Sequence, residues 1–225
     1  MATELPARSG RPPASARGAR TREALVHAAR EVFERDGFLD ARITDIAATA
    51  GVAAGSFYTY FTRKEEVFAA VIEQVNEEML HPRLRAFADR DDPVSVIEAT
   101  NRSYLAAYRR NAKLMALMEQ VAHIDDDFRR VRLRRVRAFT DRNAQAIAQL
   151  QRRGLADPEL DPQIAAQALS AMVGRMAYFR YVQGVGNDSL DTLAKTLTRL
   201  WAGALGIPLP RPSSTGRRRP SQKRR

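Results

Sequence analysis

Cysteine is absent from this chain of 225 residues, and the sites that depend on it are excluded with it. The chain has no disulfide framework and no thiolate ligand for a metal, which agrees with a protein of a reducing cytoplasm. Long apolar runs are also missing: none approaches the roughly 20 residues that a helix needs to span a bilayer. The arginine-containing N-terminus lacks the apolar stretch of a signal peptide. We therefore expect a cytoplasmic protein without a membrane segment.

Catalytic and metal-binding motifs are scarce as well. The three histidines, His27, His81 and His123, show none of the spacings, such as HExxH, that place two ligands on one metal. Neither the G-x-S-x-G pattern of a serine nucleophile nor a glycine-rich phosphate-binding loop occurs, and Gly55-Ser56 fits the start of a helix instead. The sequence predicts that the protein is not an enzyme and holds no metal or cofactor.

The net charge of +11 points to a nucleic-acid partner, but this charge is concentrated at the two ends of the chain. Residues 1–22 carry five arginines against one glutamate, and residues 208–225 carry six arginines and one lysine, so that the residues between them are neutral as a whole. Both ends are rich in proline, serine, glycine and arginine, which is typical of disordered segments. We expect a disordered basic arm over residues 1–20 and a disordered basic tail over residues 207–225, and contact with DNA stays open for both.

The most informative segment is ITDIAATAGVAAGSFYTYFTRKEE, residues 43–66. Apolar residues recur at helical spacing in its first part, and Gly51 then supplies the backbone freedom that a tight turn between two short helices needs. A second short helix is predicted over Ala54–Tyr60, with Phe57 and Phe61 facing the core. This is the pattern of a helix-turn-helix, which presents its second helix to the major groove of DNA.

The stretch AGVAAGSFYTYFTRKEEVF, which begins at Ala50, resembles the signature of the TetR/AcrR family of bacterial one-component regulators. The resemblance covers residues 22–71, and beyond them only the all-helical layout is similar. It implies an all-α fold in which an N-terminal three-helix DNA-binding domain precedes a C-terminal helical bundle for ligand binding and dimerisation. It also implies a homodimer that binds a palindromic operator in double-stranded DNA and responds to a small-molecule effector.

Carried over onto this sequence, the family pattern assigns roles in and around the second helix of the motif. The candidate DNA-binding residues are Arg42, Thr44, Ala54, Gly55, Ser56, Tyr58, Thr59, Tyr60 and Lys64. The two tyrosines and Lys64 occupy the usual phosphate-contacting positions. Ser56 and Thr59 are candidates for base contacts, because a hydroxyl can bond several bases, and the small residues before them permit close approach. Ordinary packing or exposure to water is the alternative for each.

Two pairs of residues depart from the family pattern. Ala41-Arg42 and Ala53-Ala54 stand where the family commonly has a Ser or Thr cap and a Ser-Lys or Ser-Arg pair. Direct contact with bases is therefore sparse. We hypothesise that Arg42, Thr44 and the arginines of the N-terminal arm supply the missing contacts, the arm by reaching into an adjacent minor groove.

Capping and breaking residues predict the other helices, about nine in all. Their predicted limits are Thr21 and Gly37 for the first, a Thr62–Glu65 capping box and His81-Pro82 for the fourth, Asp92-Pro93 and Arg109 for the fifth, Asn111 and His123 for the sixth, Asp125 and Gly154 for the seventh, Asp161-Pro162 and Gln183 for the eighth, and Asp188 and Leu205 for the ninth. These limits give a DNA-binding domain over residues 21–67 and an effector-binding and dimerisation domain over residues 68–206.

The second domain is rich in aromatic and flexible apolar residues with occasional polar ones, the usual lining of a ligand cavity. A helical bundle needs such residues for its core as well, so both roles stay open. The candidates for effector contact are Arg102, Tyr104, Tyr108, Met115, Met118, Glu119, His123, Phe128, Arg175 and Phe179. Residues 128–139 also hold six arginines. These form either a solvated face, neutralised by nearby acidic residues, or a site for the phosphates of an acyl-coenzyme A or another anionic effector.

The last two helices are more apolar than a solvated outer layer needs, which favours a dimer-forming pair. The candidate interface residues are Ile164, Leu169, Met172, Met176, Leu193, Leu197 and Trp201. The predicted function is that of a sequence-specific transcriptional regulator, in the family most often a repressor, which a lipophilic or acyl-coenzyme A-like effector releases from its operator. The alternative is a non-specific architectural DNA-binding protein driven by its basic tails.

Overall fold

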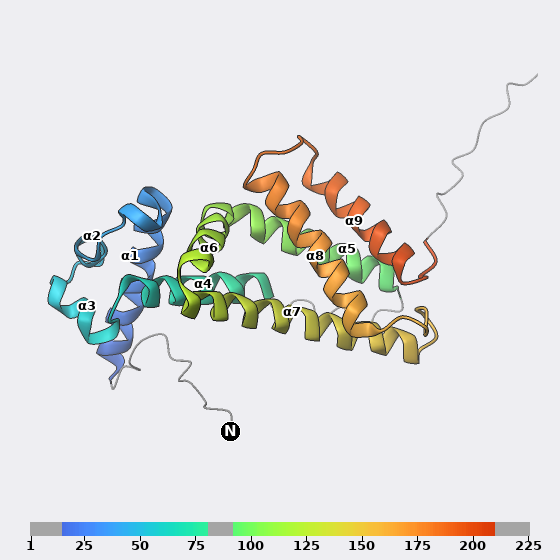
Figure 1. Cartoon of the computed structure of the whole chain (residues 1–225), viewed down its shortest axis with the longest axis horizontal. Coiled ribbons are helices and arrows are strands. Elements are labelled where there is room, and N and C mark those ends of the chain that lie inside the picture. The colour runs from blue at the N-terminus through green and yellow to red at the C-terminus, as the bar shows by residue number, and fades with distance from the viewer. Residues whose placement is uncertain (1–14, 81–91, 210–225) are drawn as a thin grey trace, which may run out of the picture.

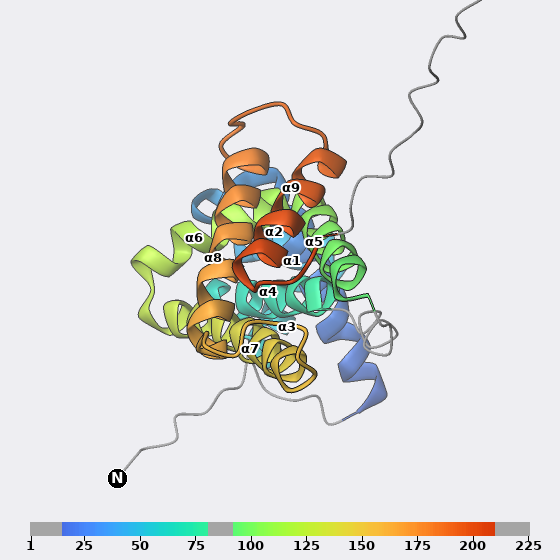
Figure 2. The same ribbon diagram turned by 90° about the vertical axis from the view of Figure 1, so that its right-hand side faces the viewer.

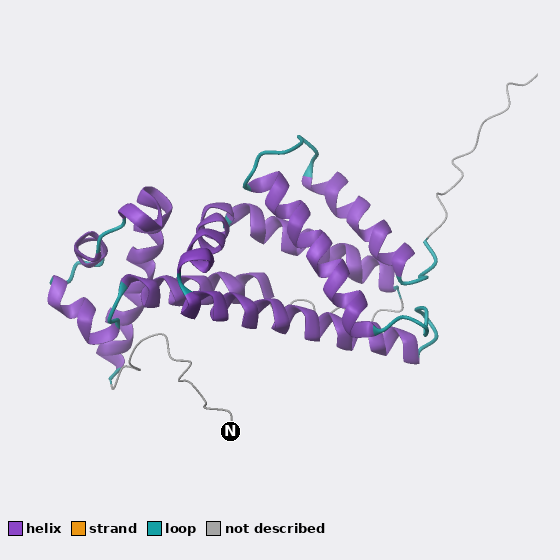
Figure 3. Ribbon diagram, viewed as in Figure 1, coloured by secondary structure: helices purple, strands orange, loops and turns teal. Residues whose placement is uncertain are grey.

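Nine α-helices and no strand make up the part of the chain described by this computed structural model, residues 15–80 and 92–209 (Figures 1 and 3). The helices are α1 (Ala16–Asp40), α2 (Ile43–Thr49), α3 (Ala54–Tyr60), α4 (Lys64–Leu80), α5 (Pro93–Arg110), α6 (Ala112–Ile124), α7 (Asp126–Arg152), α8 (Pro162–Tyr181) and α9 (Leu190–Ala204). The predicted all-α fold is thereby confirmed. Within the described ranges, no helix is both long and apolar enough to cross a membrane.

Both Asp-Pro pairs begin helices as the sequence predicts. The Asp92 carboxylate accepts two backbone N–H groups of the first turn of α5, at 3.0 and 3.3 Å, with Pro93 in the first helical position. Asp161 accepts the N–H of Ile164 at 2.8 Å in the same way before α8. Such a carboxylate satisfies donors that have no partner inside the helix, and a proline there sacrifices no hydrogen bond.

The first helix begins earlier than predicted. Ser15 caps α1, because its hydroxyl accepts the N–H of Gly18 at 3.1 Å. The predicted cap, Thr21, lies inside the helix, where its hydroxyl donates to a backbone carbonyl one turn earlier. The predicted arm over residues 1–20 is therefore helical from residue 16 onward, and residues 1–14 lie outside the described residues.

Gly37 interrupts α1 where the sequence predicts that the first helix ends. Its φ of 79° and ψ of 179° are not helical, and a short helical stretch follows the kink up to Asp40. A glycine adopts this backbone conformation at little cost, so the chain changes direction here. The predicted break at His81-Pro82 and the tail beyond residue 209 lie outside the described residues.

The capping box of α4 uses a different glutamate from the predicted one. The Thr62 N–H donates to Glu66 Oε2 at 2.8 Å, and its hydroxyl donates to Glu66 Oε1 at 2.7 Å. Because α4 begins at Lys64, Glu66 rather than Glu65 is the third residue of the helix, the position from which a side chain reaches back over the helix start.

Two other predicted caps are corrected as well. Asn111 precedes α6 but makes no side-chain cap; its amide instead donates to Glu78 Oε2 at 3.1 Å. Before α9, Ser189 rather than Asp188 is the cap, because the Ser189 hydroxyl accepts the N–H of Thr192 at 3.1 Å. At α6 a side chain from another helix binds the predicted cap, and at α9 two neighbouring polar residues could both serve, so local sequence does not decide either case.

The helices form two packed groups that α4 connects. α1 packs against α2 and α4, and α2 packs against α3, at one end of the molecule (Figure 1). In the other group α7 runs along α8 and α5 runs along α9. Figure 2 views the molecule from the far end, with α5, α7, α8 and α9 in front. We call the group α1–α3 the head and the group α5–α9 the body.

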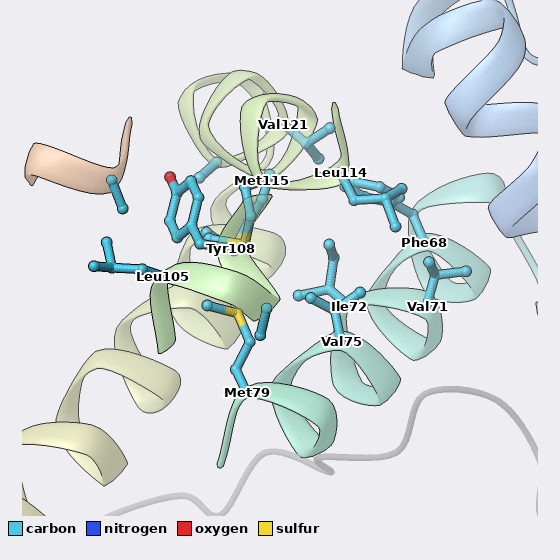
Figure 4. Close-up of a cluster of buried hydrophobic side chains, with 14 of the residues drawn as sticks. Phe68, Val71, Ile72, Val75, Met79, Leu105, Tyr108, Leu114, Met115 and Val121 are labelled. Carbon is cyan, nitrogen blue, oxygen red and sulfur yellow. The ribbon is translucent and has the colours of Figure 1, made fainter. Parts of the chain in front are cut away.

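Buried side chains of α4 hold the head and the body together. Figure 4 shows part of this cluster, in which the labelled residues are Phe68, Val71, Ile72, Val75 and Met79 from α4, Leu105 and Tyr108 from α5, and Leu114, Met115 and Val121 from α6. All are at most 6% exposed. Each such side chain contributes about 1.5–3 kcal/mol through its removal from water. Because α4 also packs against α1, it is a structural part of both groups.

Candidate DNA-binding face and cavity

Gly51 sets the angle between α2 and α3. Its φ of 68° is again in the left-handed region, and its N–H donates to the Ala48 carbonyl at 3.0 Å. Val52 follows with an N–H bond of 3.0 Å to the Ala47 carbonyl, and its side chain packs against the core. The chain thus reverses within a few residues, which places α3 across the end of α2 in the manner of a helix-turn-helix.

α3 has one buried and one exposed face. Phe57 and Phe61 are 0% and 1% exposed, with ring centroids 5.6 Å apart, so the prediction that both face the core is confirmed. Among the candidate DNA-binding residues of this helix, Ala54, Gly55, Tyr58 and Thr59 are exposed, whereas Ser56 and Tyr60 are half-buried. The two phenylalanines therefore anchor a helix of seven residues whose opposite face is open to a partner.

The other candidate DNA-binding residues differ in what they contact. Arg42 lies exposed at the N-cap position of α2, and Thr44 is exposed in the first turn of that helix. The Lys64 ammonium donates to the backbone carbonyls of Leu39 and Ala41, at 2.9 and 3.2 Å. These bonds use two of its three N–H donors and hold the start of α4 against the link between α1 and α2.

Arg63, beside Lys64, points to the body rather than to the exposed face of α3. Its guanidinium donates to Asp125 Oδ2 at 2.7 Å and to Asp127 Oδ2 at 2.9 Å, at the start of α7. The Asp125 carboxylate also caps α7 by accepting the Phe128 N–H at 2.6 Å. Burial acts to raise the pKa of Asp125, but the hydrogen bonds from Phe128 and Arg63 outweigh it and hold this pKa below its ordinary value.

Replacing Asp125 by asparagine is expected to destabilise the protein by about 1 kcal/mol near neutral pH, the size typical of a partly exposed ion pair. Asparagine keeps an oxygen for the cap and loses only the charge. Folding lowers the pKa of the Asp125 carboxyl below its ordinary value of 3.8. Its contribution to the stability of the protein is therefore complete at pH values above 3.8 and is lost as the pH falls through the lower pKa of the folded state.

Thermal unfolding of both proteins at pH 7 and near pH 3 checks this expectation. The difference in stability should shrink at the lower pH. D126N is the matched control, because Asp126 is exposed and pairs with Arg129 of the same helix instead of with the head. An equal loss for D125N at both pH values would contradict a contribution from the Arg63 ion pair.

A second polar link joins the head to the body. The Arg30 guanidinium donates to Glu78 Oε1 at 2.9 Å and to Asn111 Oδ1 at 2.6 Å, so that α1, α4 and the start of α6 share one network. Nearer the start of α4, the Phe68 ring stacks on Phe128 of α7, with centroids 5.0 Å apart. A displacement of α6 or α7 would therefore change the contacts at both ends of α4.

A cavity of about 1650 Å³ lies among α4–α9. Six of the candidate effector-binding residues line it: Tyr104, Tyr108, Met115, Met118, Glu119 and Arg175. Tyr104 packs between Tyr108 and Phe139, at centroid distances of 5.9 and 5.7 Å. Gly174 lies opposite, where an added Cβ would meet the Tyr104 hydroxyl at 3.5 Å, so α8 approaches this tyrosine closely.

The other four candidates lie away from the cavity. Arg102 pairs with Glu98 and Asp191 on the outside of α5. His123 is exposed, with Nδ1 2.6 Å from a carbonyl oxygen of its own helix. Phe128 is part of the core beside Phe68, and Phe179 lies under the Arg175 guanidinium, 4.4 Å from its Cζ atom.

Other polar residues also line the cavity, among them Arg142, which sequence reasoning did not single out, Arg132 of the arginine-rich segment, and Trp201, which was expected at the dimer interface. Arg132 belongs to the arginine-rich segment and forms a two-point ion pair with Glu119, at 2.9 Å for both nitrogens. Its neighbours Arg129 and Arg130 pair with aspartates in the first turn of α7. One side of the arginine-rich segment 128–139 therefore faces the cavity and the other faces solvent. The helical spacing of its arginines could have predicted this division.

The candidate dimer residues of α8 and α9 divide into two sets. Ile164 is 68% exposed and Met176 is 38% exposed, and Met172 is half-buried. The remaining four, Leu169, Leu193, Leu197 and Trp201, are at most 8% exposed within the single chain. The apolar character of these two helices thus arises in part from packing inside the body. Leu200, which is 51% exposed, adds to the outward-facing set.

Sequence comparison covers both groups of helices. Residues 25–71 match the family model of the bacterial regulatory proteins of the tetR family, and residues 85–206 match that of the tetracyclin repressor-like C-terminal domain. The second match alone spans more than half of the chain.

Individual proteins agree with these matches. The HTH-type transcriptional regulator TtgR of Pseudomonas putida is 27% identical over 162 residues, which are 68% of this chain and 76% of TtgR. The HTH-type transcriptional repressor BepR of Brucella suis biovar 1 is 31% identical over 170 residues, 71% of this chain and 79% of BepR. SmeT, the repressor of the Stenotrophomonas maltophilia multidrug efflux pump SmeDEF, has a similar fold, with a TM-score of 0.64 and 24% identity over 86% of this chain and 100% of its own.

Proposed function

This chain belongs to the TetR family of bacterial regulatory proteins and is a DNA-binding transcriptional regulator rather than an enzyme, and from that premise we propose that it is a repressor that a small molecule releases from its operator. The observation that carries the proposal is the exposed face of α3, which two buried phenylalanines hold outward. The cavity among α4–α9 supports the second half of the proposal. The protein then acts in the cytoplasm, where its operator lies.

In the proposed complex α3 enters the major groove. Ser56 and Thr59 contact base edges, the small surface of Ala54 and Gly55 permits close approach, and Tyr58, Tyr60 and Lys64 bind phosphates, with Arg42 and Thr44 adding contacts from α2. The Arg22 guanidinium lies over the Phe61 ring, 5.0 Å from its centroid, so the start of α1 is close to the end of α3. This proximity supports a role for the preceding arm in an adjacent minor groove.

We place the dimer axis beside α8 and α9, where Ile164, Met172, Met176 and Leu200 offer an outward apolar surface. A two-fold dimer presents two copies of α3 to successive major grooves, which are roughly 34–36 Å apart. Its operator would then be palindromic, because the symmetry of the protein is repeated in the DNA.

Release follows if the effector binds more tightly to a conformation in which the two heads no longer match their half-sites. The cavity walls include residues of α4, α6 and α7, the same helices that carry the Arg63, Arg30 and Phe68 links to the head. A lipophilic or acyl-coenzyme A-like effector in the cavity would move α4, with Phe68, Val71 and Ile72 as the coupling residues.

Selection of bound genomic fragments followed by footprinting, at two salt concentrations, tests the function. A discrete palindromic footprint that persists at the higher salt is expected. Sequence-indifferent binding that disappears with salt would instead favour the rival function, an architectural protein held to DNA by its basic tails. The family matches, and the head in which buried side chains anchor α3, argue against this architectural function.

Gly55 offers a way to separate DNA binding from folding. An added Cβ would meet nothing within 4 Å in the free protein, so the G55A variant is expected to fold and to be more stable by about 0.5–1 kcal/mol. If the backbone at this position approaches the bases, the same methyl group weakens operator binding. Melting temperature and operator affinity are therefore expected to change in opposite directions. Unchanged affinity would mean that the start of α3 lies away from the DNA.

A further inference from the structure

Tyr104 reaches from α5 toward two other helices that wall the cavity. Its ring lies beside Phe139 of α7, with centroids 5.7 Å apart. On α8, a Cβ added to Gly174 would meet the Tyr104 hydroxyl at 3.5 Å, so little space separates this hydroxyl from the backbone there. All three residues line the cavity. We call this group of Tyr104, Phe139 and Gly174 the waist.

One end of the cavity lies next to α6. There Glu119 of α6 holds Arg132 of α7 by an ion pair of 2.9 Å. Tyr108 of α5 and Met115 of α6 belong to the buried cluster that joins these helices to α4 (Figure 4). We call this end the near chamber; its lining includes Tyr108, Met115, Met118, Glu119, Arg132 and Val136.

The other end of the cavity lies next to α9. The Asn101 side-chain amide of α5 donates to the Thr198 hydroxyl of α9 at 3.2 Å, and Trp201 follows one turn later. Asn143 of α7 donates to the Ser170 hydroxyl of α8 at 2.9 Å. We call this end the far chamber; its lining includes Ile97, Asn101, Asn143, Ile147, Ser170 and Trp201.

The waist falls between the two chambers on the helices that form both of them. Along α5, the far-chamber residues precede Tyr104 and the near-chamber residue follows it. Along α7 the order is reversed, so that near-chamber residues precede Phe139 and far-chamber residues follow it. Residues before and after one position lie at different heights along a helix. The two helices therefore agree that the Tyr104 ring separates the two chambers.

The near chamber adjoins the contacts that connect the body to the head. Its α7 residues follow the aspartates at the start of that helix, Asp125 and Asp127, which hold Arg63 at 2.7 and 2.9 Å. Phe128 of the same turn stacks on Phe68 of α4. The far chamber is instead walled by α9, which packs along α5. A ligand that displaces α6 or the start of α7 thus changes contacts with the head, whereas a ligand beside α9 leaves them in place.

We propose that Tyr104 is a specificity-determining residue that divides the cavity into two chambers, and that only a ligand in the near chamber releases the operator. The inference rests on the proposed function, because it places the effector within the same cavity. Tyr104 then decides which molecules act as effectors. A molecule that fits the near chamber favours the released conformation, and a molecule confined to the far chamber binds equally well to both conformations and releases nothing.

A ligand tethered in one chamber at a time tests the assignment. The chain has no cysteine, so an introduced cysteine is the single site at which N-hexylmaleimide attaches to a thiol. M118C places the hexyl group in the near chamber and I97C places it in the far chamber. A138C is the matched control, because Ala138 is exposed on α7 and is not among the residues that line the cavity.

Operator affinity and Trp201 fluorescence are measured for each variant before and after labelling, with the extent of labelling taken from the mass. Labelled M118C is expected to lose operator affinity about tenfold or more. Labelled I97C is expected to keep its affinity and to change the emission of Trp201, the only tryptophan of the chain. Labelled A138C should show neither effect. Equal loss of operator affinity in M118C and I97C, or a reagent that reaches neither cysteine, would overturn the proposal.

Removal of the Tyr104 ring tests the division itself. N-dodecylmaleimide on M118C is expected to leave Trp201 emission unchanged, and on the double variant M118C/Y104A to change it, because the longer chain then passes the waist. M118C/Y181A is the matched control: Tyr181 is also half-buried and its ring lies 6.5 Å from Tyr108, but it does not line the cavity. A Trp201 response already present in M118C, or equal responses with Y181A and Y104A, would show that Tyr104 divides nothing.

A failure of this inference is distinguishable from a failure of the proposed function. The operator footprint is measured on the unmodified, unlabelled protein and does not depend on where a ligand binds. If that footprint is discrete and the label in the far chamber releases the operator as well as the label in the near chamber, the chain is a ligand-controlled repressor and the two-chamber assignment is wrong.

Discussion

Replacing Phe57 by alanine is expected to lower the free energy of unfolding by about 3–5 kcal/mol and to abolish operator binding. Phe57 is fully buried and its ring packs on Phe61, with centroids 5.6 Å apart. α3 has only seven residues, and a helix of this length is not stable by itself in water. Loss of the ring removes the anchor that orients the exposed face of the helix. Chemical denaturation and titration of a labelled operator measure the two effects.

The adjacent residue provides the contrast. Tyr58 is 59% exposed, so Y58A is expected to change stability by no more than about 0.5 kcal/mol. If its hydroxyl binds a phosphate, affinity falls about tenfold, for operator and unrelated DNA alike. A variant F57A that still binds its operator, or a Y58A as unstable as F57A, would refute this division of the helix into an anchoring and a binding face.

Replacing Phe68 by alanine is the second large effect, again about 3–5 kcal/mol in the free energy of unfolding. Three other rings surround Phe68: Phe33 and Phe38 of α1, at 4.9 and 5.2 Å, and Phe128 of α7, at 5.0 Å. The cavity left by this truncation lies at the junction of head and body, so the connection between them is expected to loosen as the protein is destabilised.

The functional consequence of F68A can be separated from its cost in stability. Below the melting temperature the variant should still bind its operator and an effector found by screening small molecules for release of the unmodified protein from that operator, but this effector should no longer reduce operator affinity. F68L is the control, because leucine refills most of the space and is expected to cost less stability and to retain coupling. Full release of F68A from the operator by the same effector would show that the coupling does not pass through this cluster.

The helix-turn-helix was predictable residue by residue because its determinants are local. Gly51 has the left-handed φ that its place between two short apolar patterns requires, and Phe57 and Phe61 recur four residues apart on the face that proves buried. The Asp92-Pro93 and Asp161-Pro162 helix starts depend equally on neighbouring residues. Where two polar residues compete for one cap, as at Asp188 and Ser189, the choice depends on backbone geometry that the sequence does not show.

The sequence by itself determined the all-helical fold, the order of its helices and the face that α3 exposes, because helical periodicity and capping act over a few residues. Only the tertiary structure decided the partners of the charged and aromatic side chains. Arg63 meets an aspartate 62 residues away, and Trp201, expected at an interface, lines the cavity. The physical reason is that periodicity indicates which side of a helix is buried, whereas the element that buries it is chosen by the packing of all the helices together.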